Sequence, residues 1–490
     1  MRCQLYGSQA LACAVVACSA GCTVKPPVAV QRTPETRVAL QYRFRAADQA
    51  LLEDVEHACF LYFWNEVGTP AKLVRDRKNA PVASIAAAGF QLASLPIGVE
   101  HRWISRSEGA QRAQTVLQSL LERDDNKKFG VYLHYPDMNT GGLSGQGFEI
   151  LASTVDHALL MAGAMVAGEY FGDAVAPLVG RLIAGTNWRA YAVAPGGFLS
   201  MGWAPDDAGD LAGAGRFVEL RWDWASDEER LIYFLAVGSP EPNYALPPET
   251  YYRLKRVVKS YDGRPAYVVS WPGALFTYLF SHCYIDYRSL GPDDPAQFGV
   301  DAPRVDWFEN SRRAVLTHRQ RCIEQASRFK TLGPDRWGLS ACSSREGYIV
   351  PDIRPNASGN EDWCAGTVPP YAAASAIMFA PQESLAAMRA YRALKDGEGR
   401  ALVWRDPQAG GYGFVDSFNL DQGFACEDYV GIDQGPMLLA IENARTGLIW
   451  KLFMQHELAR RAVERLHLSC EVIVGHPSAR PVAPHGQVQD

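Results

Sequence analysis

The 490-residue sequence lacks the motifs by which most cofactor-dependent and nucleic-acid-binding proteins are known. It has no G-x-G-x-x-G loop, no P-loop, no C-x-x-C pair and no Cys/His spacing typical of zinc. The histidines are scattered, and none has a Ser or Cys beside it in a nucleophile-elbow arrangement. The net charge is −6, with mixed signs and no basic stripe. We therefore expect no cofactor, no metal and no nucleic-acid partner, which leaves carboxylates as candidate catalytic groups.

Long apolar runs are scarce, and the notable short one lies at the N-terminus. Ala10–Cys18 is apolar, and Ser19–Cys22 resembles a bacterial lipoprotein cleavage box. We expect residues 1–22 to be a signal segment lipidated at Cys22 and residues 23–35 to be a tether, which predicts an exported, periplasmic or outer-membrane-anchored lipoprotein. An ordinary cleaved signal peptide is the alternative. No later run is long enough to span a bilayer.

Helical periodicity dominates the rest of the chain, and 48% hydrophobic content is ample for a large core. A short strand is expected at 129–134. Between residues 36 and 467 no stretch has the composition of a linker, so we predict one all-α domain there and a C-terminal tail at 468–490. The hairpins could close into a toroid or form an open bundle. The expected helices are 34–66, 83–95, 105–122, 150–171, 175–191, 227–237, 248–258, 274–285, 307–327, 371–379, 381–395, 434–446 and 449–466.

Aromatic residues are plentiful, with 12 Trp and 21 Tyr. Such side chains either fill the core or form flat platforms on which sugar rings lie. Two cysteines, Cys342 and Cys364, flank a loop rich in Gly, Pro and Asn and could form a disulfide in an oxidising compartment.

Several carboxylates stand at expected helix starts or in aromatic loops, and cleavage of a glycosidic bond needs two such groups, one protonated and one ionised. Each also has a simpler explanation, because an acid in a first turn caps the helix or faces solvent. The candidates are Asp137, Glu149, Asp156, Glu228 and Asp433.

The stretch Tyr429–Pro436 illustrates the ambiguity. Glycines and a proline break the backbone around Asp433 and Gln434, and an apolar helix follows. Asp433 therefore lies at the mouth of a helix, either as a cap or as part of a polar cavity.

Nine segments, in order along the chain, resemble the glucoamylase-like domain family, which includes the endo-β-1,2-glucanases of glycoside hydrolase family 144. The resemblance implies an (α/α)6 barrel that cleaves β-1,2-linked glucan in a central cleft. The segments are Ala83–Phe90, Leu95–Glu100, Trp103–Arg106, Ser153–Gly163, Leu235–Pro240, Phe308–Ala314, Trp337–Leu339, Gly431–Pro436 and Thr446–Trp450.

The resemblance also implies roles for particular residues. Glu228 occupies the position of the family's general acid, with Asp227 in place of an Asn. Asp137 matches the family's Asp-Met turn, and Asp156 and Asp433 match acidic positions facing the cleft. The Glu that usually stands immediately before the Ser-Thr motif is absent here; either Glu149, two residues earlier, fills its role through a local shift, or the role is missing. Side chains expected to stack on sugars or bond to their hydroxyls are Tyr62, Trp64, Arg106, Trp203, Trp222, His282, Gln434 and Trp450.

We expect a monomeric glycoside hydrolase acting on an oligo- or polysaccharide, most simply β-1,2-glucan, with Glu228 as acid and Asp433 or Asp156 aligning water. Two other hypotheses remain: a glucan-binding lipoprotein without catalysis, and a β-1,2-glucan transglycosylase. A lyase is disfavoured because no Lys/Arg cluster lies in the candidate loops.

Overall fold

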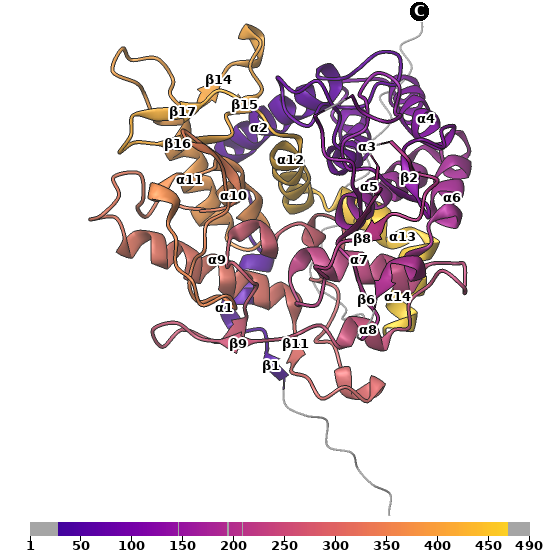
Figure 1. Cartoon of the computed structure of the whole chain (residues 1–490). Coiled ribbons are helices and arrows are strands. Elements are labelled where there is room, and N and C mark those ends of the chain that lie inside the picture. The colour runs from indigo at the N-terminus through magenta and orange to yellow at the C-terminus, as the bar shows by residue number, and fades with distance from the viewer. Residues whose placement is uncertain (1–27, 146, 194–195, 208, 469–490) are drawn as a thin grey trace, which may run out of the picture.

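The fold is mostly helical, with many very short strands in the loops (Figure 1). The structure is a computed structural model that describes residues 28–145, 147–193, 196–207 and 209–468. In these ranges no helix combines the length and the apolar character needed to cross a membrane. The expected signal segment and Cys22 lie outside the described residues, as does most of the C-terminal tail.

The α-helices of the described residues are α1 (Pro34–Leu40), α2 (Ala46–Asn65), α3 (Ile85–Glu100), α4 (Arg106–Leu121), α5 (Thr154–Phe171), α6 (Ala176–Gly185), α7 (Asp227–Gly238), α8 (Glu249–Tyr252), α9 (Trp307–Glu324), α10 (Pro370–Ser375), α11 (Pro381–Ala393), α12 (Gly431–Arg445), α13 (Leu448–Gln455) and α14 (Glu457–Arg465).

The strands pair in small sheets, of which β4–β7–β8 has three strands and the others two. They are β1 (Val28–Val30), β2 (Lys127–Lys128), β3 (Val131–Tyr132), β4 (Ala152–Ser153), β5 (Ala192–Val193), β6 (Phe198–Leu199), β7 (Gly202–Ala204), β8 (Arg216–Phe217), β9 (Val258–Lys259), β10 (Tyr267–Val268), β11 (Arg304–Val305), β12 (Cys342–Ser344), β13 (Gly347–Ile349), β14 (Trp404–Arg405), β15 (Gly413–Phe414), β16 (Ser417–Asn419) and β17 (Phe424–Cys426).

Most predicted helices are present, and the differences have local causes. The predicted helix 34–66 is divided into α1 and α2, and 449–466 is divided at His456, whose backbone is extended and whose ring accepts from the Leu458 N–H. The predicted helix 274–285 is wrong, since only two short 3-10 turns form there. Helix α3 does not end at Pro96 but continues to Glu100, because burial on every side of α3 outweighs the missing N–H of the proline.

Helices α3 and α5 pack at very close range. A Cβ on Gly163 would lie 1.8 Å from the Gly89 carbonyl oxygen, and one on Gly89 would lie 2.1 Å from the Leu159 carbonyl oxygen. Glycine is therefore required where the two backbones touch. Helix α12 packs against α3 and α10, and α7 packs against α5, so these helices form the buried centre of the domain.

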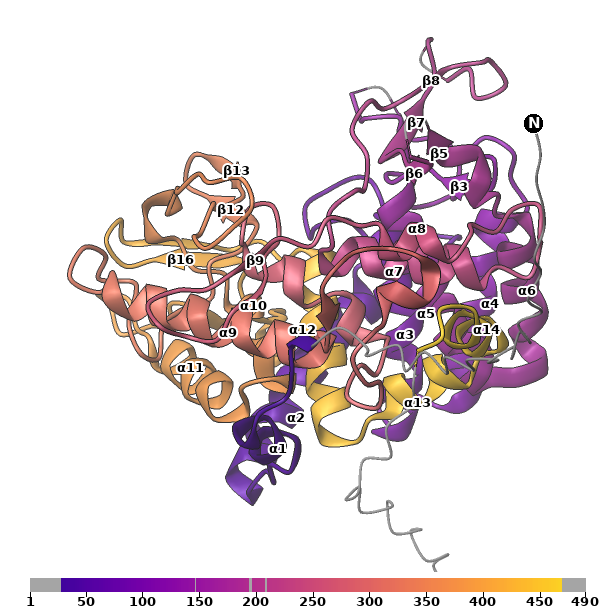
Figure 2. The same ribbon diagram turned by 90° about the horizontal axis from the view of Figure 1, so that it is seen from below.

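The first residues of α3, α5 and α12 lie at one end of the domain, where backbone hydrogen bonds tie each of them to a neighbouring loop. The Ile85 N–H donates to the His134 carbonyl (3.0 Å), and the Gly431 N–H donates to the Asp76 carbonyl (2.8 Å). Trp222, just before α7, donates its indole N–H to Thr154 Oγ1 at the start of α5 (2.8 Å). Strands β5, β7 and β8 and the hairpin β12–β13 rise on one side of the helices (Figure 2).

Two predictions, one on the N-terminal tether and one on a disulfide, need correction. Strand β1 pairs in parallel with β11, and Val30 is fully buried, so residues 28–35 of the expected tether pack against the domain. Cys342 and Cys364 both carry free thiols, as do the other four cysteines in the part of the chain that the structure describes.

Candidate active site

A pocket of about 850 Å³ opens beside the first turn of α7. Glu228 lies in its wall, half-buried, together with Trp222, Trp224 and Trp271. Trp224 and Trp271 meet edge to face at a centroid distance of 5.1 Å, and Trp271 is 51% exposed. Flat aromatic faces around a carboxyl group are suited to holding a sugar ring.

The carboxyl group of Glu228 is poised to donate a proton. Its burial, the Asp156 carboxylate and the Asp227 carboxylate together raise the pKa of Glu228 from 4.5 to about 8. Glu228 therefore stays protonated at neutral pH, as a general acid must.

Asp156 belongs to a second group of charges beside Glu228, in the first turn of α5. Its carboxylate accepts from the Ser153 hydroxyl and lies 3.7 Å from Nδ1 of His134. Burial lowers the pKa of His134, but Asp156 and Glu149 outweigh this and raise it. Nε2 of His134 lies 3.5 Å from Glu149, which is 65% exposed, so Glu149 stands at the rim rather than inside the pocket.

Asp433 lies in the first turn of α12 and is almost fully buried, but the first turn shows no side-chain capping bond. Burial and the adjacent Asp416 carboxylate raise the pKa of Asp433 well above its ordinary value, against the weaker effect of Arg77. Asp416 in turn accepts from the Ser343 N–H (2.8 Å), and Arg77 pairs with Asp76 (3.1 Å). Asp433 is thus a buried carboxyl group of raised pKa rather than a cap.

Asp137 is not free to act on a ligand. One carboxylate oxygen accepts from the Asn139 N–H, the Thr140 N–H and the Thr140 hydroxyl at 2.8 to 3.0 Å. These bonds stabilise the turn of the loop before α5, so Asp137 has a structural role in this loop.

Five of the expected sugar contacts are nearly or fully buried. The prediction failed for them because the residue type alone does not show which face of a helix or loop a side chain occupies. Their polar atoms bond to the protein interior: the Tyr62 hydroxyl to Arg75, the Trp203 indole to Ala214, and the Trp450 indole to His282. The five, which do not line the pocket beside Glu228, are Tyr62, Trp203, His282, Gln434 and Trp450.

Two further expected contacts also lie away from Glu228. Trp64 carries the Arg112 guanidinium over its ring at 3.9 Å. Arg106 lies over Tyr170, at the end of α5 opposite to Asp156, and donates to the Tyr170 carbonyl. Since α5 has 18 residues, about 25 Å of helix separates its two ends. Of the expected sugar contacts, Trp222 alone lines the pocket beside Glu228.

A cluster of ligand-type atoms lies at this opposite end. Atoms of Glu53, Glu56 and His101 approach within 4.8 Å of one another. Arg445 already binds both glutamates, and His101 bonds to Glu53 (2.9 Å) and Glu442 (3.0 Å). The carboxylates are thus paired with cations of the protein itself, which disfavours a metal ion there.

Sequence reasoning missed several residues of the site. Asp416 lies in a loop far from any helix start, and Tyr348, which interacts electrostatically with both Asp433 and Glu228, lies in the β12–β13 hairpin. Trp224 follows Trp222 in the aromatic loop, a pattern that could have identified it. Nothing local to Asp416 or Tyr348 signals their position.

Known proteins resemble this chain over most of its length. Residues 219–457 match the model of a family described as "Putative glucoamylase". Over 470 residues the chain is 25% identical to an exo-β-1,2-glucooligosaccharide sophorohydrolase (non-reducing end) of Parabacteroides distasonis, a match that covers 89% of this chain and 60% of that protein. The chain thus spans about 60% of the length of this curated relative.

Solved structures share the fold. An endo-β-1,2-glucanase from Chitinophaga pinensis, in complex with sophorotriose and glucose, is 24% identical, with a TM-score of 0.70 over 85% of this chain and 97% of its own. A β-1,2-glucanase from Parabacteroides distasonis is 24% identical, with a TM-score of 0.69 over 87% of this chain and 60% of its own.

A helical domain with a carboxyl-lined, tryptophan-rich pocket is suited to a carbohydrate ligand. Over residues 219–457 the chain is similar to the glucoamylase-like family.

Proposed function

We propose that the protein is a glycoside hydrolase that cleaves β-1,2-linked glucan, with Glu228 as the proton donor to the leaving oxygen. The observation that carries the proposal is the Glu228 carboxyl group, whose pKa of about 8 keeps it protonated beside three tryptophans. The linkage is inferred from the relatives, whose names specify β-1,2-glucans. Whether cleavage is endo or exo is a matter for product sizing.

Asp156 is the better candidate for the carboxylate that activates water. A general base has to be ionised, and Asp156 is paired with the His134 imidazole and with the Ser153 hydroxyl. Burial and the Asp416 carboxylate raise the pKa of Asp433, which favours the protonated form that can donate a hydrogen bond to a sugar hydroxyl.

The helices fit an (α/α)6 barrel. Helices α3, α5, α7, α10 and α12 lie around a common centre (Figure 1), and the 3-10 turns at 275–283 contact α7, α9 and α12. Helices α2, α4, α6, α8, α9 and α11 alternate with them along the chain and supply the outer ring. The inner helices that carry Asp156, Glu228 and Asp433 present them in their first turns.

A screen of linear glucans of defined linkage tests the proposal. We expect reducing ends to be released from β-1,2-glucan, and release to fall at least about a hundredfold in Glu228→Gln, as loss of a general acid predicts. Glu383→Gln is the matched control, since Glu383 lies in the first turn of α11 away from the pocket. Equal rates for Glu228→Gln and the wild type would exclude Glu228, and binding without turnover would point to a glucan-binding protein.

The proposed location follows from the N-terminal sequence alone. We propose that the protein is exported and lipidated at Cys22. Membrane fractionation and mass spectrometry of the mature N-terminus test this, and a soluble product that starts beyond residue 22 would contradict it.

A further inference from the structure

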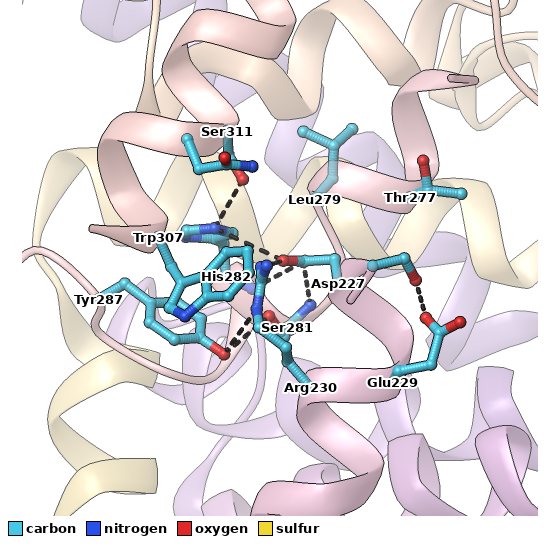
Figure 3. A network of polar contacts seen from close by, with 12 residues as sticks. Asp227, Glu229, Arg230, Thr277, Leu279, Ser281, His282, Tyr287, Trp307 and Ser311 are labelled. Atoms are coloured by element: carbon cyan, nitrogen blue, oxygen red, sulfur yellow. Dashed lines mark hydrogen bonds and ion pairs between the residues drawn. The ribbon is translucent and has the colours of Figure 1, made fainter. Parts of the chain in front are cut away.

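Glu228 is preceded by a second acidic residue, Asp227, which is completely buried and whose polar contacts are drawn in Figure 3. A negative charge placed next to a proton donor in the interior is costly unless fixed partners hold it. Such partners surround Asp227. One carboxylate oxygen accepts from the backbone N–H groups of Ser281 (2.6 Å) and His282 (3.3 Å), and the other pairs with the guanidinium of Arg230.

Arg230 lies one turn further along α7 and cannot swing away from Asp227. Its guanidinium carbon lies 3.9 Å from the centre of the Trp307 ring, and Nε donates to the Tyr287 hydroxyl (3.4 Å). The side chain is only 2% exposed. The ion pair therefore clamps the first turn of α7, which carries Glu228, to the 281–282 turn and to α9.

The nearby histidine does not add a second positive charge. Nε2 of His282 lies 3.5 Å from Asp227 and 2.9 Å from the Ser311 hydroxyl. Burial, and then Arg230, lower the pKa of His282 well below its ordinary value. The imidazole is neutral at physiological pH, so Arg230 supplies the positive charge of this network.

The charged and titratable groups around Glu228 come from α5, α7, β13 and the loops of the pocket, which carry Glu219, Arg221, Asp223 and Lys255. Asp156 approaches from α5, Asp227 and Glu229 from α7 itself, and Tyr348 from β13. Glu229 accepts from the Ser226 hydroxyl, and burial raises its pKa well above the ordinary value, which favours its protonated form. The two acids that act on Glu228 as charges are Asp156 and Asp227. Burial raises the pKa of Asp227, and Arg230 together with the Ser281 and His282 N–H groups opposes this rise.

We propose that Asp227 and Arg230 are positioning residues for the proton donor: the buried ion pair holds Glu228 in the pocket wall and sets the pH at which Glu228 loses its proton. The inference rests on the proposed function only for the catalytic role of Glu228.

The two partners should move the titration of Glu228 in opposite directions. Asp227→Asn removes a negative charge, so the Glu228 proton is lost about one pH unit lower. Arg230→Gln leaves Asp227 unneutralised, so the proton is lost about one unit higher. Arg230→Lys keeps the positive charge and should leave the titration of Glu228 near that of the wild type. This variant keeps the test usable if Asp227→Asn or Arg230→Gln folds poorly.

The titration is read in two ways. The carboxyl stretching band of Glu228, isolated by infrared difference against Glu228→Gln in each background, reports proton loss without any activity. The alkaline limb of kcat/KM on β-1,2-glucan should move with it. If the infrared shifts occur and no glucan is cleaved, the proposed function has failed and the positioning role stands.

A second buried pair supplies the control. Asp293 and Arg256 are fully buried, bond at 2.9 Å and also contact Trp307, but Asp293 does not act on Glu228. Asp293→Asn should cost stability like Asp227→Asn and leave the Glu228 titration unchanged. Equal titrations of Glu228 in wild type, Asp227→Asn and Arg230→Gln, or shifts of the same sign, would overturn the inference.

Discussion

The raised pKa of Glu228 has a consequence for stability that does not depend on any substrate. In the folded protein Glu228 holds its proton up to about pH 8, whereas in the unfolded chain it ionises near pH 4.5. Below pH 4.5 both states are protonated and the carboxyl group costs nothing. As the pH rises towards 8, the unfolded chain releases the proton and the folded one does not, so stability is lost.

The size of the effect follows from the same two values. The rise from 4.5 to about 8 corresponds to at most about 5 kcal/mol, at about 1.4 kcal/mol per pH unit. Solvent at the pocket mouth reduces this to on the order of 2 to 3 kcal/mol. Glu228→Gln cannot ionise, so it should match the wild type near pH 4.5 and exceed its stability by that amount at pH 9.

Urea unfolding of the two proteins at pH 4.5, 6, 7.5 and 9 measures the difference. The other titrating groups are common to both proteins, so they cancel to first order in the comparison. A difference that is constant with pH would refute the argument, because it would show that Glu228 ionises alike in the folded and unfolded chain. A wild type more stable than the variant at pH 9 would refute it too.

Three further changes have defined outcomes. Gly163→Ala should lower the free energy of unfolding by about 3 kcal/mol or more, measured in urea, because its Cβ would collide with the α3 backbone. His101→Gln should lower the free energy of unfolding by about 1 to 2 kcal/mol below pH 6.5, and by less at pH 9, in the same assay. Burial lowers the pKa of His101, but Glu442 and Glu53 outweigh burial and raise this pKa. The stabilisation by His101 is therefore lost as the pH rises through its pKa in the folded protein. Trp222→Leu should raise KM for glucan about tenfold through loss of stacking, and should lower the free energy of unfolding by about 1 kcal/mol through loss of the hydrogen bond to Thr154.

The sequence predicted the helices well where periodicity was long. Helices α4, α7 and α9 begin within about one or two residues of the prediction, and α4 opens on a capping box of Ser105 and Glu108. The segment 274–285 failed because apolar periodicity does not distinguish a helix from buried 3-10 turns, which here are held by contacts with α7 and α9. Those contacts are formed only in the folded chain.

The candidate site was predictable only in its acids. Position at a helix start identified Asp156, Glu228 and Asp433, because inner helices that begin at the same end bring their first turns together. The sugar platforms were mostly mistaken: Trp203 and Tyr62 are core residues, and nothing in their immediate sequence distinguishes them from Trp222. The pKa values of these carboxyl groups could not be predicted from the sequence either, since they depend on burial and on charges that are distant along the chain.

The most direct test of the account is the release of reducing ends from β-1,2-glucan between pH 5 and 10 by wild type and Glu228→Gln. The account predicts turnover by the wild type that declines with a midpoint near pH 8, and loss of turnover in the variant. Equal turnover by the two proteins would contradict it. So would a wild-type rate whose decline with rising pH has its midpoint below pH 6.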